Sequence, residues 1–382
     1  MVPSAATPSL SLPPAQFASL QPHAYLLAHL SPPALSNQPS IRANGRSPSQ
    51  FRATSANAGS LTHANGSAVV RLGDTAAVCG VRAEILHTDD IASWSVSSST
   101  GAGNKRRKLS GEDPEDPEES QIQDLNLLVP NLSLSTGCAP GFIPGAPPSA
   151  LAQSLSHQLL TLLHTSRLVR TDDLRIWYDV PDLEGAGQET GEAMDVDVVD
   201  KESSLKQPRK REIKAFWVLY IDVMIVSLAG NVLDAAWAAV LAALRDTKLP
   251  RAWWDVDAES VLCSNRVDEA RSLLLRGLPV CSSFCVFEAD AAAGWRAVVL
   301  PTSIEMEQNK QQQRWILADP DGYEEGLTQE RMCIVLDKDQ SGNPVIVRME
   351  KNGGWTVGKE DLRQLVDVSA QRWEEMKTVL KW

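Results

Sequence analysis

The sequence predicts a two-layer α+β fold, in which mixed β-sheets are covered by helices. Three observations indicate it. β-rich runs alternate with runs of helical spacing, in the order strands, helix, strands, helix, strands, helix. Tight-turn dipeptides join the first strands into an antiparallel meander. The hydrophobic fraction of 43% over 382 residues is sufficient for one large domain or two ordinary ones.

The N-terminal half is expected to begin with a short helix and to continue as strands. Residues 1–39 form an N-terminal extension with helical spacing near 15–30. Asn65-Gly66 and Gly73-Asp74 favour tight turns, which makes residues 54–62, 67–72 and 75–86 a three-stranded meander. The remaining elements predicted here are a strand over 122–135, a helix over 150–166 and a strand over 174–179.

The C-terminal half begins with an apolar stretch over residues 215–244. Asp222, Asn231 and Asp234 interrupt it, and its pattern changes from strand-like to helical near Gly230. We therefore interpret it as a buried strand followed by a core helix rather than as a membrane span. The later elements predicted are strands over 279–288, 296–301, 315–318, 332–337 and 344–350, and a closing helix over 359–381.

Two polar segments, about 95–120 and 184–211, are predicted to be disordered insertions. The first contains the basic run Lys105, Arg106, Arg107 and Lys108, which has the form of a monopartite nuclear localisation signal. The alternative is a solvated charge run, balanced by the acidic residues that follow it. The localisation expected from the signal is the nucleus.

The composition limits the function. The formal net charge is -12, whereas an autonomous nucleic-acid binder usually has a basic surplus. The six cysteines contain no C-x-x-C pair and the histidines no metal-binding spacing, so we expect reduced, mostly buried thiols, no metal and no cofactor. Nucleotide-binding and nucleophile-elbow motifs are also absent from the sequence.

Several short segments follow one another in a distinctive order. They are Ile41-Arg42-Ala43-Asn44-Gly45-Arg46, Phe51-Arg52, Gly66-Ser67-Ala68, Leu72-Gly73-Asp74-Thr75, Cys79-Gly80-Val81-Arg82-Ala83-Glu84, Gly230-Asn231-Val232-Leu233-Asp234-Ala235, Leu278-Pro279-Val280, and Ala318-Asp319-Pro320 with Glu324-Glu325. Together they resemble the noncatalytic RNase PH-like ring subunits of the eukaryotic RNA exosome. Each segment is a weak signal, but their order and spacing over residues 40–380 are specific. The resemblance implies the RNase PH-like fold, also described as ribosomal protein S5 domain 2-like, with domain 1 over 40–250 and domain 2 over 251–382.

The resemblance also implies that this chain has lost catalysis. Active relatives hold inorganic phosphate with a Gly-Ser/Thr-Arg turn at a helix N-terminus, and an Asp before a Met/Leu-Pro pair assists the transfer. Here the turn reads Gly230-Asn231-Val232, and Gly277 precedes Leu278-Pro279. The degenerate positions are therefore Asn231, Val232 and Gly277, and no catalytic residue is expected.

The candidates for RNA contact are Arg42, Arg46, Arg52 and His157. His157 lies on a helix that faces the central channel in related subunits. The alternative for the arginines is a solvated turn with salt bridges to neighbouring subunits. The carboxylates Asp319, Asp321, Glu324 and Glu325 are interpreted as a solvated loop rather than as a magnesium site.

The function implied by the resemblance is structural: a noncatalytic subunit of the exosome core ring, which supports 3′-5′ RNA processing and degradation. Its partners would be other RNase PH-like subunits in a six-membered ring, S1/KH cap subunits, and RNA in the channel, with no membrane. The processes implied are ribosomal RNA processing, nuclear RNA surveillance and mRNA turnover, in nucleus, nucleolus and cytoplasm. Two alternatives stay open: a phosphate-dependent 3′-5′ exoribonuclease, and a free-standing protein that binds AU-rich RNA.

Overall fold

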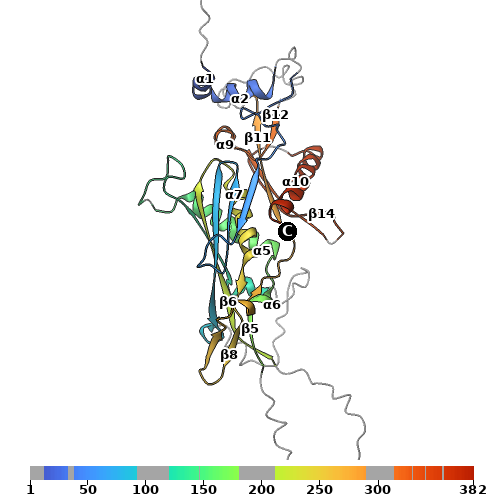
Figure 1. Ribbon diagram of the computed structural model, residues 1–382. Coiled ribbons are helices and arrows are strands. Elements are labelled where there is room, and N and C mark those ends of the chain that lie inside the picture. Colours follow the sequence, from blue (N-terminus) through green and yellow to red (C-terminus); the bar gives the residue numbers. More distant parts are fainter. Residues whose placement is uncertain are drawn as a thin grey trace, which may run out of the picture.

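The computed structural model describes residues 13–32, 38–92, 120–145, 147–179, 211–289, 314–328, 330–339, 341–354 and 357–382. Two main sheets stand one above the other in Figure 1, with helices between and beside them. Apart from Ser120 and Arg211, both predicted insertions lie outside the described residues, as do Lys105 to Lys108 and the predicted strand 296–301.

The larger sheet contains six strands and is mixed, as predicted. Its order is β1-β2-β3-β6-β4, and β5 pairs with β6. The strands are β1 (Thr54–Ala58), β2 (Gly66–Leu72), β3 (Thr75–His87), β4 (Leu128–Leu134), β5 (Arg175–Asp179) and β6 (Arg211–Ser227). The strand order and the antiparallel pairing of the meander β1-β2-β3 are confirmed, but the tight turn expected at Asn65-Gly66 is wrong, because β1 ends at Ala58 and a loop over 59–65 leads to β2. β4 and β6 run parallel.

Helix α7 (Val232–Asp246) lies between the two sheets and forms the centre of the molecule. It contacts β2 and β3 of the larger sheet and β11 of the smaller one. Its sequence is apolar on nearly all sides, which is typical of a fully buried helix. Trp237 donates from Nε1 to the Pro279 carbonyl oxygen at 2.7 Å, and so links the helix to the chain that enters β11.

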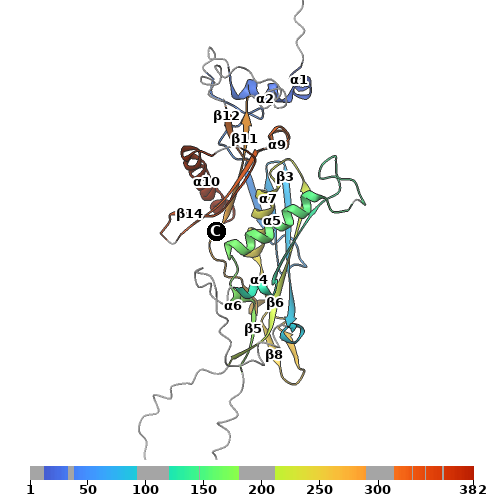
Figure 2. The ribbon, with the colours of Figure 1, turned by 180° about the vertical axis from the view of Figure 1, so that it is seen from behind.

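Helix α5 (Ala150–Ser166) packs beside β4 and has the predicted boundaries. The Ser149 hydroxyl caps it by accepting from the Ala152 N–H at 3.2 Å. Leu155, Leu159 and Leu162 are on its buried side, whereas Gln153, His157 and Thr165 are exposed. Figure 2 shows α5 in front of the larger sheet.

The smaller sheet is antiparallel, with the order β12-β11-β13-β14. Its strands are β11 (Val280–Glu288), β12 (Arg314–Ala318), β13 (Glu330–Lys338) and β14 (Pro344–Asn352). α10 (Lys359–Val379) packs on β11 and β13. The short α9 (Gly322–Leu327) follows β12 and begins with a capping box at Asp321.

The short elements differ most from the sequence prediction. The expected N-terminal helix is two helices, α1 (Pro14–Leu20) and α2 (Pro22–Leu30), because Pro22 cannot donate the hydrogen bond that would continue α1. The expected strand 122–135 begins as α4 (Ser120–Asp124) and becomes β4 only from Leu128. The elements not predicted are α6 (Thr171–Leu174), α9, the pair β7 (Lys248–Leu249) and β10 (Arg271–Ser272), the hairpin β8 (Ala252–Asp255) and β9 (Ser260–Cys263), and the 3-10 turns Thr88–Asp90 and Val267–Glu269.

Two composition-based expectations can be compared with the structure. No helix within the described ranges is long and apolar enough to cross a membrane, and residues 215–244 are indeed a strand followed by a core helix. The six cysteines are free thiols: Cys79, Cys138, Cys281 and Cys285 are buried and Cys333 is half-buried. Cys263 is exposed, because it lies at the end of the β8-β9 hairpin rather than in the core.

Candidate functional site

The turn that precedes α7 has an unusual backbone. Gly230 has φ of +86°, and Asn231 has φ of +51° in the left-handed region. A Cβ atom at position 230 would lie 2.5 Å from the backbone carbonyl carbon of Asp321 and from the Gly322 nitrogen. Only glycine permits this approach. The turn at Gly230 and the acidic segment after β12 therefore pack backbone against backbone.

Asn231 directs its donors at three carboxylates. Its backbone N–H donates to Glu325 Oε1 at 3.0 Å. Its side-chain amide donates to Asp234 Oδ2 at 2.8 Å and to Asp319 Oδ1 at 2.7 Å. Anions are favoured at a helix N-terminus, and here the chain supplies them from its own side chains.

Asp319 and Glu324, both buried, are held by three arginines. Arg52 grips Asp319 with Nε at 2.9 Å from Oδ2 and Nη2 at 2.8 Å from Oδ1, a bidentate pair. Arg42 donates from Nε to Glu324 Oε1 at 2.7 Å and forms a second, shorter bond from Nη2 to Oε2. Arg46 donates to Asp319 Oδ2 at 3.3 Å. We call these five side chains the arginine–carboxylate cluster.

The protonation of the carboxylates follows from this arrangement. Burial would raise the pKa of Asp319, but the hydrogen bonds from Arg52 and Asn231 outweigh it and lower the pKa below its ordinary value. Asp234 is enclosed without an arginine, and its burial raises its pKa although Cys281, Ser283 and Asn231 donate to it. Burial likewise raises the pKa of Glu325. The ionised form is therefore stabilised at Asp319, whereas burial disfavours the ionised form of Asp234 and Glu325.

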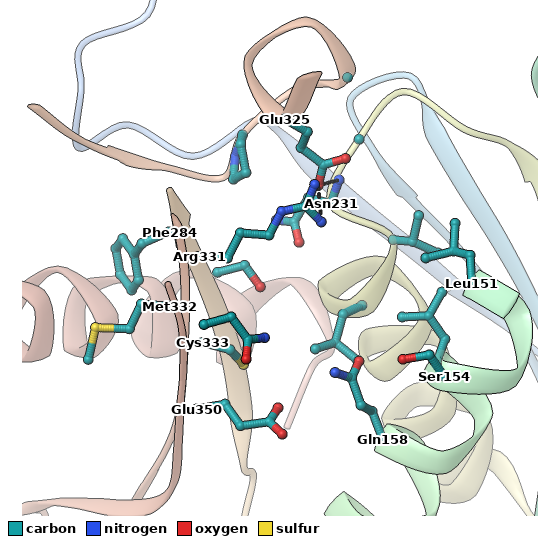
Figure 3. Close-up of a pocket in the computed structure, with 18 of the residues that line it drawn as sticks. Leu151, Ser154, Gln158, Asn231, Phe284, Glu325, Arg331, Met332, Cys333 and Glu350 are labelled. Carbon is teal, nitrogen blue, oxygen red and sulfur yellow. Dashed lines mark hydrogen bonds and ion pairs between the residues drawn. The ribbon is translucent and has the colours of Figure 1, made fainter. Parts of the chain in front are cut away.

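A cleft of 560 Å³ opens beside the turn (Figure 3). α5 contributes Leu151, Ser154 and Gln158 on one side, and the smaller sheet contributes Arg331, Cys333 and Glu350 on the other. Arg331 is the single basic residue among the described residues that line the cleft, and its guanidinium lies 4.0 Å from Glu325. The cleft is thus poor in positive charge beside the turn.

The arginines expected to contact RNA have other partners in the structure. Arg42 was predicted to contact RNA, and the structure contradicts this. Arg42 is 1% exposed, and its guanidinium donates to Glu324 and to the carbonyl oxygens of residues 318 and 319. Arg46 and Arg52 are largely buried and form ion pairs with Asp319. The alternative named salt bridges to neighbouring subunits, whereas the ion pairs that the structure shows for these arginines are within the chain.

His157 and the acidic residues differ in their exposure. His157 is exposed on α5, away from the arginine–carboxylate cluster, and its RNA contact stays a prediction. The interpretation of the acidic residues as a solvated loop is wrong for Asp319 and Glu324, which are buried against arginines. Among the described residues no group of three or more His, Cys, Asp or Glu side chains is arranged to hold a metal ion.

Gly277 does not join the other degenerate positions. Asn231 and Val232 line the cleft, whereas Gly277 lines a separate pocket of 400 Å³ with Asp337 and Trp373. Cys281 and Ser283 of β11 both donate to Asp234, in the first turn of α7. Among the degenerate positions, Gly277 therefore lines a different pocket from Asn231 and Val232.

Sequence reasoning missed the roles of Asp234 and Ser283. Asp234 accepts from the Ser283 N–H at 3.0 Å and from its hydroxyl at 2.7 Å, which joins α7 to β11. The available signal was a charged residue in an otherwise apolar helix, since a buried carboxylate needs several donors. The partner 49 residues away had no comparable signal.

Comparison with known proteins agrees with this architecture. Residues 50–250 match the RNase PH model, described as the 3′ exoribonuclease family, domain 1. The chain is 29% identical over 363 residues to exosome complex component rrp43 of Schizosaccharomyces pombe, covering 95% of this chain and 96% of the relative. It is 24% identical to exosome complex component Rrp42 of Methanothermobacter thermautotrophicus, covering 87% and 86%.

Solved structures support the fold. The Archaeoglobus fulgidus exosome with RNA bound to the active site has a chain that aligns with a TM-score of 0.55 at 21% identity, covering 93% of this chain and 96% of that one. A chain of an archaeal exosome core aligns with a TM-score of 0.53 at 20% identity, covering 97% and 100%. The predicted RNase PH-like fold and the resemblance, most specifically to ribosomal RNA-processing protein 43, are confirmed. The chain belongs to the RNase PH, or 3′ exoribonuclease, family.

Proposed function

We propose that this chain is a noncatalytic, structural subunit of an exosome core ring. The observation that carries the proposal is the chemistry of the α7 turn, where the donors of Asn231 bind the chain's own carboxylates. The named relatives are exosome components, and the match to the relative from S. pombe covers nearly the whole of both chains. The chain would support 3′-5′ RNA processing and degradation by others rather than perform it.

By the resemblance, the turn Gly230-Asn231-Val232 corresponds to the turn with which active relatives hold phosphate, and its residues here do not suit that role. Val232 stands where the resemblance expects an arginine, and it is buried and uncharged. The Asn231 N–H, which would face the anion, already donates to Glu325. A phosphate dianion would have to displace a carboxylate from the helix N-terminus without gaining a bidentate cation.

The surroundings of Gly277 bear on the proposal only by showing that an acidic residue does not fit at this position. Gly277 has φ of +74°, and an added Cβ atom would strike the Asp337 carboxylate. An aspartate at this place would be strained and would meet a second negative charge. The proposal thus rests on Val232 and the carboxylates around the turn, and Gly277 adds only that an acid does not fit there.

The partners and locations follow from the same proposal. The chain would pair with other RNase PH-like subunits in a six-membered ring, beneath S1/KH cap subunits, with RNA passing through the channel. The processes are ribosomal RNA processing, nuclear RNA surveillance and mRNA turnover. The basic run Lys105 to Lys108 supports a nuclear and nucleolar location, with a cytoplasmic pool for mRNA turnover.

The first test is native affinity purification of the tagged full chain from its own cells, with partners identified by mass spectrometry. The expected result is five other RNase PH-like proteins in equal amounts, together with cap subunits. A tag on an abundant protein of similar charge gives the background. Recovery of the chain alone or as a homo-oligomer would overturn the ring proposal.

A second test addresses the alternative of a phosphate-dependent 3′-5′ exoribonuclease. The full chain and the double variant Val232→Arg/Gly277→Asp are incubated with 5′-labelled RNA and inorganic phosphate. We expect no nucleoside diphosphate from either protein, since Glu325 still occupies the turn and position 277 faces another pocket. Measurable phosphorolysis by the double variant would contradict a broadly degenerate site.

A further inference from the structure

The surface at the C-terminal end of α5 carries a group of basic side chains. They come from three segments that are distant in sequence, and we call them the basic ridge: Arg167, Arg170, Lys248, Arg271 and Arg276. All five are exposed. Arginine predominates, and its planar fork suits phosphate better than the lysine ammonium does.

Backbone pairing brings the three segments together. Val169 and Leu275 form an antiparallel bridge, and the Arg276 N–H donates to the Leu168 carbonyl oxygen at 2.9 Å. Arg170 and Arg276 are the residues that follow the bridge on each side. The third segment is brought in by the pairing of β7 with β10. Leu249 lies opposite Arg271 and Lys248 lies opposite Ser272, so Lys248 and Arg271 are on adjacent strands. The ridge is therefore a product of tertiary structure and is dispersed in the sequence.

The charge of this surface is opposite to that of the whole chain. Residues 167–176 and 264–278 together contain six arginines and four carboxylates, in a chain of net charge -12. Three of those carboxylates have partners of their own. Asp172 pairs with Arg175 at 2.9 Å, Asp173 accepts from the Leu274 N–H at 3.0 Å, and Glu269 lies 3.8 Å from Arg266. Within the described part of the chain, Arg170 and Arg271 have no ion pair.

The position of the ridge relates it to the proposed RNA path. α5 is the helix on which His157 was expected to face RNA, and Arg167 is its C-cap residue. A helix rises about 1.5 Å per residue, so the ridge begins about 15 Å from His157 along α5. The arginines first considered for RNA contact are buried or largely buried against carboxylates, whereas the five residues of the ridge are exposed.

We propose that the basic ridge binds the phosphodiester backbone of single-stranded RNA. This rests on the proposed function, in which the chain borders an RNA path. Contact with phosphates alone carries no sequence preference, as suits a channel through which many RNAs pass. The recognition is electrostatic, so its strength depends on salt.

The test uses the full chain assembled with its ring partners. The ridge variant is Arg170→Gln/Lys248→Gln/Arg271→Gln. The matched control is Arg71→Gln/Lys359→Gln/Arg363→Gln, which removes the same residue types from exposed positions on β2 and α10. Binding of a labelled 30-nucleotide oligouridine is measured by filter retention between 50 and 300 mM salt, with ring recovery checked for each variant.

For single strands the slope of log affinity against log salt is about 0.7 per neutralised phosphate. The ridge variant should therefore lower the magnitude of this slope by about 2, and its loss of affinity should be greatest at low salt. The control should leave the slope within about 0.5 of the unmodified ring. A ridge variant that assembles and behaves like the control overturns the inference and leaves the proposed function intact.

Two other outcomes are distinguishable. If the ridge variant alone loses ring partners while its residual rings bind RNA normally, the ridge is a protein interface and the inference is wrong. If the unmodified chain recovers no RNase PH-like partners, the proposed function itself fails.

Discussion

Arg52→Met removes the guanidinium that holds Asp319 and keeps most of the aliphatic stem. The Arg52 guanidinium donates two bonds to Asp319, at 2.9 and 2.8 Å, and one to the Ala229 carbonyl oxygen at 2.9 Å. Asp319 has no exposed surface. The substitution therefore leaves a buried carboxylate beside Asp234 and Glu324 with one strong cationic partner fewer.

The expected loss is about 3–5 kcal/mol in the free energy of unfolding, the range for breaking one side of a buried ion pair. Arg71→Met on β2 is the matched control, because Arg71 is exposed and should change stability by less than about 0.5 kcal/mol. The double variant Arg52→Met/Asp319→Asn should cost less than the sum of the single variants by about 1–3 kcal/mol, since it removes both charges.

The effect of Arg52→Met should depend on pH. The pKa of Asp319 in the folded protein is below its unfolded value, since Arg52 and Asn231 outweigh burial. The ion pair therefore stabilises the fold fully above the unfolded pKa of about 3.9 and loses this effect as pH falls through the folded pKa. The difference between the two proteins should be greatest near neutral pH and shrink below about pH 4.

The assay is urea denaturation of the full chain, followed by tryptophan fluorescence at several pH values. A loss below about 1 kcal/mol for Arg52→Met at neutral pH would refute the reasoning. So would a double variant whose loss equals the sum of the single variants, because the two groups would then not be coupled.

Three further substitutions can be measured in the same way. Gly230→Ala should destabilise by about 2 kcal/mol more than Gly137→Ala, because both glycines have positive φ but only position 230 faces backbone at 2.5 Å; equal losses would show that the turn can move. Gly277→Asp should cost about 2 kcal/mol or more through positive φ and the clash with Asp337, and an unchanged urea midpoint would contradict this. Trp237→Phe should cost about 1–3 kcal/mol by removing a buried donor from its carbonyl partner, and a smaller loss would mean that another donor replaces it.

The long periodic elements could be predicted from the sequence because their signals are local. The helix of residues 150–166 has the predicted boundaries, and the strand-to-helix change near Gly230 marks where β6 ends and α7 begins. Gly73-Asp74 joins β2 to β3 as expected. Each prediction depended on turn chemistry or periodicity within about fifteen residues.

The site could not be predicted in the same way, because its bonds join residues that are distant in sequence. Arg42 and Glu324 are 282 residues apart, and Arg52 and Asp319 are 267 apart. A basic turn and an acidic loop each have the composition of a solvated segment, and only the fold shows that each neutralises the other. The basic ridge was missed for the same reason, since its arginines belong to separate short segments.

On the proposed function, the charges around the N-terminus of α7 explain why Val232→Arg alone would not create a phosphate site. Five carboxylates meet at this turn, namely Asp234, Asp319, Asp321, Glu324 and Glu325, and the basic residues near them are Arg42, Arg46, Arg52 and Arg331. Three of these arginines hold the N-terminal segment against the smaller sheet, so releasing them for a phosphate would expose buried charge. Position 232 and Glu325 line the same cleft, so an arginine introduced there would have this carboxylate as a competing partner for its charge. On the proposed function, the same carboxylates that occupy the turn also hold the N-terminal segment against the smaller sheet, so the groups that exclude phosphate are groups that the fold needs.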